Sequence, residues 1–268
     1  MDYYRNKRVF ITGGSSGIGK ATARLLKNAG AQVWIAARGA DRLEATAIEL
    51  GCGWTPMDVS KVESVNAGAI AVLEGLGGLD IVINNAGIAH PATMLDTPAD
   101  IFDQMMQVNY MGTVHVTRAL LPHLRTQGSG HICNVASLLG FMGIYGYTAY
   151  AASKFAITGF SDCLRQELIG TGIGISVLFP ADTDTPQLHE ENKIKPPETK
   201  AIAGEVKTMS PETVAMAMLK GIQKGTYHIV PGAMSKFTYF MYRHAPGVVR
   251  WVIDAELKKY RRKNPTAG

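Results

Sequence analysis

The segment that says most about the architecture of this chain is Arg8-Val9-Phe10-Ile11-Thr12-Gly13-Gly14-Ser15-Ser16-Gly17-Ile18-Gly19. Its first five residues are a largely apolar run of strand length, the glycines and serines favour a tight turn, and a segment with helical periodicity follows. Glycines in such a turn let the backbone approach a phosphate, and the N–H groups that begin the helix attract an anion. The pattern predicts a strand, a phosphate-binding turn and a helix; the alternative is an ordinary strand-to-helix turn.

Runs of strand length alternate with segments of helical periodicity along the chain. We expect strands at residues 8–12, 32–36, 79–84, 130–136, 174–179 and 227–230, a weaker one near 54–57, and helices at 18–28, 41–49, 62–73, 99–124, 149–168 and 211–220. Strict alternation implies right-handed crossovers and a parallel sheet with helices on both faces. The predicted fold class is α/β, with a single Rossmann-type doubly wound parallel sheet.

Two segments break this alternation. Residues 182–209 contain no clear strand and include Pro186, Pro196 and Pro197. A connection of that length inside a compact domain is usually functional, often as a lid. The sequence therefore predicts a catalytic domain at residues 1–235 with a substrate lid at 182–209, followed by a basic, aromatic-rich tail at residues 236–268.

Composition and cysteine usage favour a reducing compartment. The chain has 268 residues, 46% of them hydrophobic, which is enough for a sizeable core. Cys52, Cys133 and Cys163 form no Cys-x-x-Cys pair and are odd in number, which argues against a disulfide framework. The first residues lack the apolar core of a signal peptide, and no stretch has the pattern of a membrane span. We expect a cytoplasmic protein.

The net charge of +5 is concentrated at the carboxyl end. Residues 236–268 carry eight Lys or Arg and two Asp or Glu, whereas the remainder carries 19 basic and 20 acidic residues. A body without net positive charge binds nucleic acid poorly, so we expect no nucleic-acid partner. His90, His115 and His189 have no metal-like arrangement, and we expect no metal site.

The side chains after the second predicted strand bear on the choice of cofactor. Ala36-Ala37-Arg38 ends that strand, and Arg42 follows one helical turn later. Proteins that select NAD usually place an acidic residue near this point for the ribose hydroxyls, whereas two arginines suit a 2′-phosphate. The sequence predicts a preference for NADP(H); the alternative is that both arginines are ordinary surface residues.

Tyr150 and Lys154 are four residues apart in a predicted helix, and Ser137 precedes the tyrosine by thirteen residues. Positions i and i+4 share a helix face, so we expect the lysine ammonium beside the phenol. A fixed cation lowers the pKa of a tyrosine and makes the phenol a better proton donor to a developing alkoxide. Tyr145 and Tyr147 are competitors, but neither has a lysine four residues later.

Polar and small residues mark the ends of other predicted strands. Asp58 follows the weak third strand, where a carboxylate suits either an adenine amino group or a helix N-cap. Asn84-Asn85-Ala86-Gly87 ends the fourth strand, and its small residues leave room for a cofactor across the sheet. Asn109 is a poor helix former among apolar neighbours, and is either a functional amide or a satisfied core amide.

The chain resembles the short-chain dehydrogenase/reductase superfamily over residues 6–235. The resemblance rests on a set of motifs in a fixed order: Thr-Gly-x-x-x-Gly-x-Gly, Asn-Asn-Ala-Gly, a helical Asn, Ser and Tyr-x-x-x-Lys. The resemblance implies that Tyr150 is the acid/base and that Ser137 polarises the carbonyl. It implies that Lys154 binds the nicotinamide ribose and lowers the tyrosine pKa, and that Asn109 holds a water in a proton relay. Besides Tyr150 and Lys154, it implies cofactor contacts from Gly13, Ser15, Ser16, Gly17, Ile18, Gly19, Asp58, Val59, Asn85, Ala86, Gly87, Pro180 and Thr183.

A narrower resemblance lies in the predicted lid. Four short segments are similar to those of 3-ketodihydrosphingosine reductases. They are Pro180-Ala181-Asp182-Thr183-Asp184-Thr185-Pro186, Glu190-Glu191-Asn192, Lys195-Pro196 and Glu198-Thr199. That branch reduces the ketone of a long-chain aminoketone with NADPH. Asp182 and Asp184 suit pairing with a substrate ammonium; the alternative is that both cap the following turn or helix. The superfamily often has Pro-Gly after its sixth strand, where this chain has Pro180-Ala181.

The carboxyl-terminal tail has an amphipathic pattern. A helix at residues 249–260 places Val249, Val252, Ile253, Leu257 and Tyr260 on one side, with basic residues opposite. A basic amphipathic helix with aromatic neighbours lies either in a bilayer interface or against a partner subunit. The superfamily resemblance also implies a homodimer or homotetramer through the helices of Asn109 and Tyr150.

The sequence thus predicts an NADPH-dependent reductase acting on a lipid-like ketone, with 3-ketodihydrosphingosine as the expected substrate. Two rivals remain at this point. One is the same chemistry on another apolar ketone or alcohol, such as a steroid, a retinoid or an acyl chain. The other is an NADP-binding sensor that does not catalyse, against which the intact Ser137, Tyr150 and Lys154 argue.

Overall fold

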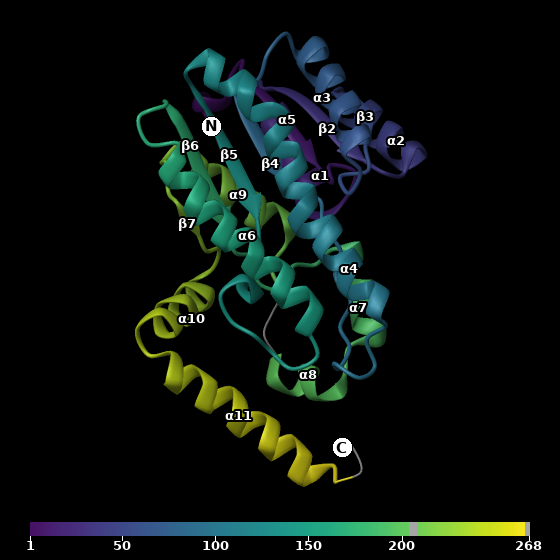
Figure 1. The fold of residues 1–268 in the computed structure, drawn as a ribbon, viewed down its shortest axis with the longest axis vertical. Coiled ribbons are helices and arrows are strands. Elements are labelled where there is room, and N and C mark those ends of the chain that lie inside the picture. Colours follow the sequence, from purple (N-terminus) through teal and green to yellow (C-terminus); the bar gives the residue numbers. More distant parts are fainter. Residues whose placement is uncertain (204–207, 266–268) are drawn as a thin grey trace.

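Seven parallel strands form the central sheet in a computed structural model that describes residues 1–203 and 208–265 (Figure 1). The strand order is β3-β2-β1-β4-β5-β6-β7, and every neighbouring pair is parallel. Their bounds are β1 Arg8–Thr12, β2 Gln32–Ala37, β3 Gly53–Pro56, β4 Ile81–Asn84, β5 Gly130–Val135, β6 Ile173–Leu178 and β7 His228–Ile229. The predicted doubly wound α/β fold is confirmed, including the weak third strand.

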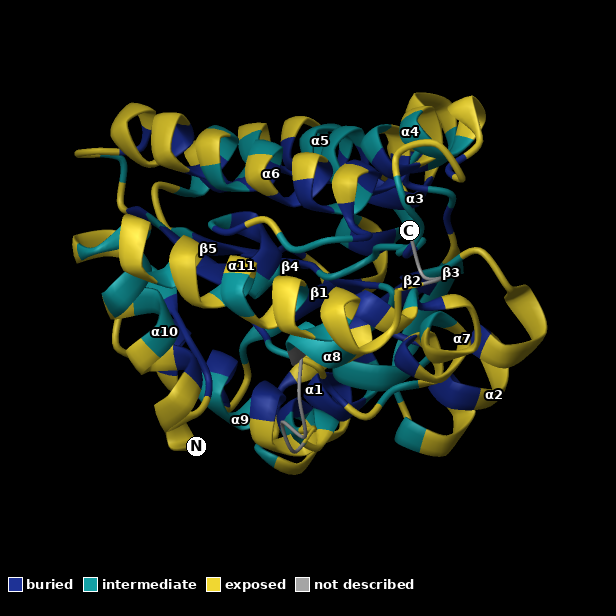
Figure 2. Ribbon diagram, turned by 90° about the horizontal axis from the view of Figure 1, so that it is seen from below, coloured by how far each residue is buried: buried dark blue, intermediate teal, exposed yellow. Residues whose placement is uncertain are grey.

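Helices cover both faces of the sheet, and Figure 2 shows the buried strands between the two layers. One layer consists of α3 (Val62–Leu76), α5 (Gly112–Gln127) and α6 (Thr148–Glu167). The other consists of α1 (Gly17–Asn28), α2 (Ala40–Leu50) and α9 (Pro211–Gln223). Strand side chains alternate between these layers, so each face contributes to a separate core. On β1, Val9 and Ile11 pack toward α1, whereas Phe10 packs toward α3 and α5.

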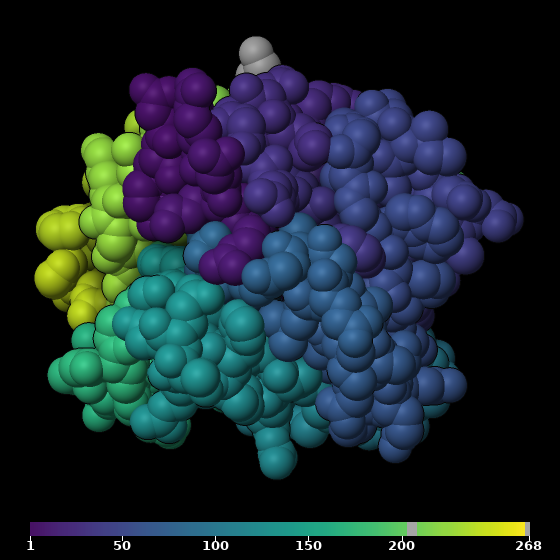
Figure 3. Space-filling model, turned by 90° about the horizontal axis from the view of Figure 1, so that it is seen from above, coloured from purple at the N-terminus to yellow at the C-terminus, as the bar shows by residue number. Residues whose placement is uncertain are grey.

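The amino-terminal residues close one edge of the molecule. A short 3-10 turn at Asp2–Tyr4 buries Tyr4 completely, and its hydroxyl donates a hydrogen bond to the Leu219 carbonyl of α9 at 2.5 Å. Figure 3 looks onto this face and shows the purple N-terminal residues beside the yellow-green residues of α9. This face lies at the amino ends of the strands, so a ligand site at their carboxyl ends lies on the opposite side.

The predicted long helix at residues 99–124 is not continuous. The structure has α4 at Ala99–Met105, a π-helical turn at Met106–Met111 and then α5. Asn109 lies inside the π-helical turn and is fully buried. The wider turn changes the phase of the helix around this amide, and such π-bulges are frequent at functional sites.

The segment at residues 182–209, expected to be irregular, contains two short helices and includes residues 204–207, which lie outside the described residues. The helices are α7 at Pro186–Ile194 and α8 at Pro197–Ala203. Thr185 caps α7, because its hydroxyl accepts a hydrogen bond from the Leu188 N–H at 3.2 Å. A capping threonine followed by proline at the first helical position is a helix start signal, so α7 was predictable from the sequence.

Two helices complete the chain. They are α10 at Ala233–His244, which the sequence analysis did not predict, and α11 at Pro246–Lys263, which contains the predicted helix at residues 249–260. The end of the predicted tail, residues 266–268, lies outside the described residues. Helix α11 packs against α8, and none of its residues is fully buried (Figure 1). No helix in the described part of the chain is long and apolar enough to span a bilayer.

Candidate active site

A cavity of about 740 Å³ lies at the carboxyl ends of the strands. Its lining brings together residues from the glycine-rich turn, the ends of β2, β4 and β5, the start of α6, and helices α7 and α11. In a doubly wound sheet this edge is where ligands bind, beside the strand at which the order of the sheet reverses. Here that reversal falls between β1 and β4. The cavity is therefore the candidate site for both cofactor and substrate.

The glycine-rich turn forms a cradle in which Gly13, Gly17 and Gly19 occupy positions unsuited to a side chain. Gly13 and Gly17 adopt φ angles of +67° and +52°, in the left-handed region that favours glycine. A Cβ on Gly19 would lie 2.2 Å from the Gly13 carbonyl oxygen, so only glycine fits there. Ser16 caps α1 without a side-chain hydrogen bond, so no capping side chain takes up the N–H groups of the first turn. The turn fits the pyrophosphate of a dinucleotide, as the sequence predicts.

Arg38 and Arg42 lie together at the rim of the cavity. Both side chains are exposed and line the cavity, Arg38 directly after β2 and Arg42 in the first turn of α2. Among the residues that the structure describes, Asp182 and Glu191 are the acidic residues that line the cavity, and both belong to the segment at residues 182–209. The rim near Arg38 thus presents positive charge, which suits a phosphate group.

Most of the other predicted cofactor residues also line the cavity. They are Ser15, Ser16, Ile18, Val59, Asn85, Ala86, Gly87, Pro180 and Thr183. Asp58 and Gly19 do not line it. The Asp58 carboxylate accepts hydrogen bonds from the Ser60 N–H at 3.1 Å and the Ser60 hydroxyl at 2.7 Å, which places it in a local turn before α3. Its contact with adenine stays a prediction.

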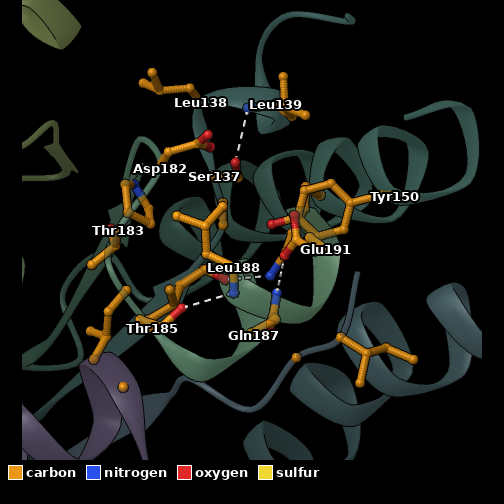
Figure 4. A pocket seen from close by; sticks show the side chains of 18 of the residues that line it. Ser137, Leu138, Leu139, Tyr150, Asp182, Thr183, Thr185, Gln187, Leu188 and Glu191 are labelled. Carbon is orange, nitrogen blue, oxygen red and sulfur yellow. Dashed lines mark hydrogen bonds between the residues drawn. The ribbon is translucent and has the colours of Figure 1, made fainter. Parts of the chain in front are cut away.

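Ser137, Tyr150 and Lys154 line one part of the cavity. Tyr150 and Lys154 both belong to α6, and the lysine Nζ lies 5.7 Å from the centre of the tyrosine ring. The Lys154 ammonium donates a hydrogen bond to the Val135 carbonyl of β5 at 3.0 Å, which fixes it between helix and sheet. The Ser137 hydroxyl accepts from the Leu139 N–H at 3.1 Å (Figure 4). The arrangement puts a hydroxyl, a phenol and an ammonium on one cavity wall.

Asn109 lies behind this wall rather than on it. Its side-chain oxygen accepts from the Ile88 N–H at 2.8 Å, and its amide nitrogen donates to the Ile88 carbonyl at 3.0 Å and to the Ser153 hydroxyl at 2.9 Å. The amide therefore joins the segment after β4 to α6. Its predicted place in a proton relay stays a prediction, and the observed bonds give it a positioning role.

Glu191 and Lys195 also reach the cavity, and the sequence analysis assigned neither of them a role. Both lie in or directly after α7, and the Glu191 carboxylate accepts hydrogen bonds from the Tyr147 hydroxyl and from Gln187, each at 2.9 Å. Figure 4 shows the Glu191 side chain in the same part of the pocket as Tyr150. The helical spacing of Gln187, Glu191 and Lys195, four residues apart, is the sequence signal that they share a face.

Apolar side chains form much of the remaining wall. They come from the loop after β5, from α7 and α8, and from α11, and they are Leu138, Leu139, Met142, Ile144, Leu188, Ile202, Val249, Val252 and Ile253. The predicted apolar face of the tail helix thus contributes to the cavity wall. A wall of this composition suits an apolar substrate.

Ionisation in the site differs from the sequence-based expectation. Burial, followed by the negative charge of Glu191, raises the pKa of Tyr150 above its ordinary value, and the nearby Ser137 only partly offsets this. Burial also lowers the pKa of Lys154 to about 8, with the charge of Glu191 opposing the shift. The expectation that Lys154 lowers the pKa of Tyr150 is therefore not met in this structure, because burial and the charge of Glu191 raise that pKa.

The described residues contain no cluster of three or more His, Cys, Asp or Glu placed to hold a metal ion. His189 lies on the surface, where its Nε2 is 2.7 Å from a carboxylate oxygen of Asp184. His115 contacts the Val59 carbonyl through Nδ1 at 3.0 Å.

A glycine cradle at the switch point of a parallel sheet, with a serine, a tyrosine and a lysine beside it, defines an oxidoreductase that uses a nicotinamide dinucleotide. The family model described as short chain dehydrogenase matches residues 7–195. The chain belongs to this family.

Individual relatives agree with this assignment. The 3-ketodihydrosphingosine reductase of Dictyostelium discoideum is 36% identical over 249 residues, which cover 84% of this chain and 74% of that protein. The 3-dehydrosphinganine reductase of Danio rerio is 37% identical over 232 residues, covering 82% and 69% respectively. A crystal structure of a short-chain dehydrogenase/reductase from Burkholderia phymatum in complex with NAD shares the fold. It has a TM-score of 0.81 and 24% identity, and the match covers 91% of this chain and 95% of that one.

The lowered pKa of Lys154 predicts an alkaline limit to activity. As pH rises through about 8, the ammonium loses its proton, and kcat/KM for the cofactor should then fall by about tenfold per pH unit. We expect Glu191→Gln to move this limit to lower pH, because the Glu191 charge raises the Lys154 pKa. The measurement is kcat/KM for the cofactor between pH 6 and 10. A wild-type profile that stays flat across this range contradicts the prediction.

Proposed function

We propose that this protein reduces the ketone of a long-chain aminoketone with NADPH, converting 3-ketodihydrosphingosine to dihydrosphingosine in sphingolipid synthesis. The observation that carries the proposal is a cavity with the Ser137, Tyr150 and Lys154 set at one part and an apolar wall reaching α11 at another. The names of the relatives at 36% and 37% identity support the same substrate.

Tyr150, Ser137 and Lys154 have different roles in the proposed reduction. When bound, NADPH supplies the hydride that goes to the carbonyl carbon. Tyr150 gives its phenolic proton to the carbonyl oxygen, and Ser137 donates a hydrogen bond to that oxygen as negative charge develops. Lys154, anchored at 3.0 Å on the Val135 carbonyl, presents its remaining N–H groups to the cofactor ribose and its charge to the phenol. Hydride and proton together convert the ketone into a secondary alcohol.

A substrate panel with Tyr150→Phe as its control tests this proposal. We expect NADPH-dependent reduction of 3-ketodihydrosphingosine to exceed that of steroid, retinoid and simple acyl ketones. The phenylalanine variant lacks the proton donor, so turnover should fall by at least about 100-fold while NADPH still binds. Cofactor oxidation and NADPH fluorescence titration measure the two properties. If the phenylalanine variant retains turnover, Tyr150 is not the proton donor. If the wild type binds NADPH but no ketone oxidises it, the alternative of a non-catalytic NADP-binding sensor is favoured.

Arg38 and Arg42 support the choice of NADPH over NADH. A charge-assisted hydrogen bond to the 2′-phosphate contributes about 1.5–3 kcal/mol, so Arg38→Ala or Arg42→Ala should lower kcat/KM for NADPH by about 10- to 100-fold. NADH lacks the phosphate, so its kcat/KM should change little. Arg24→Ala is the matched control, because Arg24 is paired with Glu49 at 2.8 Å and does not line the cavity. Equal use of the two cofactors by the wild type contradicts the proposal.

We also propose that α10 and α11 rest on an anionic lipid surface from which the substrate is drawn. The two helices expose a set of large apolar side chains, Met234, Phe237, Phe240, Val248, Trp251 and Val252. Among these, Met234 and Val252 also line the cavity, so the exposed set is continuous with its wall. The last turn of α11 adds Arg261, Arg262 and Lys263, which suit anionic headgroups.

Vesicle binding tests the lipid surface. We expect the protein to float with phosphatidylserine-containing vesicles at low salt, and to do so less with phosphatidylcholine alone or at high salt. Phe240→Ser with Trp251→Ser should remove most of this binding, since Trp251 is 70% exposed. Ile169→Ser is the control, because Ile169 is 72% exposed but follows α6, outside these two helices. Unchanged flotation of the double variant contradicts the lipid surface and leaves subunit packing as the function of α11. The homodimer or homotetramer predicted from the family resemblance stays a prediction.

A further inference from the structure

Among the described residues at 182–209, the carboxylates of Asp182 and Glu191 line the cavity and Asp184 lies between two lining residues, and the partners of these three differ. Asp182 is 3.3 Å from the ammonium of Lys195, whose side chain is 5% exposed. Asp184 lies on the surface, 2.7 Å from His189, and does not line the cavity. Glu191 lines the cavity and has no Lys, Arg or His within 4.0 Å among the residues that the structure describes. Of the three, Glu191 is the carboxylate whose charge is left without a close basic partner there.

Glu191 is held in a fixed position by neutral groups. The Tyr147 hydroxyl donates to one carboxylate oxygen and the Gln187 amide donates to the other, both at 2.9 Å. The rings of Tyr147 and Tyr150 are 5.6 Å apart between centres. The tyrosine that is bonded to Glu191 therefore packs beside Tyr150, the proton donor. The negative charge of Glu191 is, after burial, the second cause of the raised pKa of Tyr150. A half-buried carboxylate so placed is ready to accept a cation from the cavity side.

We propose that Glu191 binds the ammonium group of the substrate and thereby selects amino ketones over neutral ketones. This inference rests on the proposed function, because it concerns the group next to the ketone that Tyr150 protonates. In a 2-amino-3-ketone the ammonium is carried by the carbon adjacent to the carbonyl carbon. A carboxylate that recognises it must therefore lie close to the proton donor, as Glu191 does.

The local charge balance favours Glu191 over Asp182 for this role. Asp182, Glu191 and Lys195 form a group of two carboxylates and one ammonium on this wall, and Lys195 is already bonded to Asp182. The Lys195 ammonium also lies 5.9 Å from the centre of the ring of Tyr147, whose hydroxyl is bonded to Glu191. One further ammonium balances the charge of the group. The sequence left pairing with a substrate ammonium and capping both open for Asp182 and Asp184, and in the structure each is bonded to a basic side chain of the protein.

Glu191→Gln is the informative variant, because the amide is nearly isosteric and its oxygen still accepts a hydrogen bond from Tyr147. The assay compares 3-ketodihydrosphingosine with its N-acetyl derivative, which keeps the ketone and chain but has no ammonium. We expect the wild type to prefer the free amine. In the variant, the ratio of kcat/KM for the amine to kcat/KM for the amide should fall by about 10- to 100-fold, mainly through KM for the amine. Glu191→Asp should restore part of the preference.

Asp184→Asn is the matched control, since it removes a nearby carboxylate that is paired with His189 outside the cavity. It should leave the ratio unchanged. A wild type that prefers the amine and a Glu191→Gln variant that keeps this preference overturn the role of Glu191 and leave the proposed function intact. A wild type that reduces only the N-acetyl compound or other neutral ketones overturns the proposed substrate as well. Equal thermal unfolding temperatures of the variants exclude a folding defect as the cause of a changed ratio.

Discussion

The site depends on how the ends of β1 and β4 are joined. The Thr12 hydroxyl accepts hydrogen bonds from the N–H groups of Asn85 and Ala86, each at 3.1 Å, and the Asn85 amide donates to the carbonyls of Thr12 and Gly13 at 3.0 and 3.1 Å. Gly19 packs against the Gly13 carbonyl and the Asn85 amide, which leave no room for a Cβ on Gly19. These contacts hold the start of α1 against the end of β4, at the place where the strand order reverses. The cofactor cradle and the reacting wall therefore keep a fixed separation, which a hydride transfer requires.

The parts of this arrangement that follow from local chemistry were predictable from the sequence. A strand of apolar residues, a turn that only glycine tolerates and a helix start lie within residues 8–19, and each is decided by its nearest neighbours in the chain. The parallel sheet with helices on both faces follows from the alternation of strands and helices with right-handed crossovers, whereas the strand order was not predicted. Tyr150 and Lys154 share a wall because the i, i+4 spacing of a helix puts them there.

The remaining parts depend on contacts between distant segments or on burial. The π-helical turn around Asn109 depends on an amide that is fixed by Ile88 and Ser153, residues that lie on other elements. Helix α10 was not predicted because no capping residue marks its start in the sequence. Gly232 precedes the helix and makes no side-chain cap hydrogen bond. The pKa of Tyr150 was expected to fall because the sequence shows the neighbouring cation, whereas it cannot show how far the phenol is removed from water. The position of Glu191 is likewise set by where α7 packs, not by its neighbours in the chain.

The charges on the cavity wall also bear on how a substrate affects its own proton donor. Burial raises the pKa of Tyr150, and the negative charges of Glu191 and Asp182 raise it further. A phenol whose pKa is raised is a weaker acid toward a developing alkoxide. An ammonium bound at Glu191 would compensate the charge with the larger effect on Tyr150 and add a positive charge beside the carbonyl oxygen, so it would favour proton donation and stabilise the nascent oxyanion. A neutral ketone would give neither effect, so under the proposed role of Glu191 the ammonium that is recognised would also strengthen the acid that protonates the ketone.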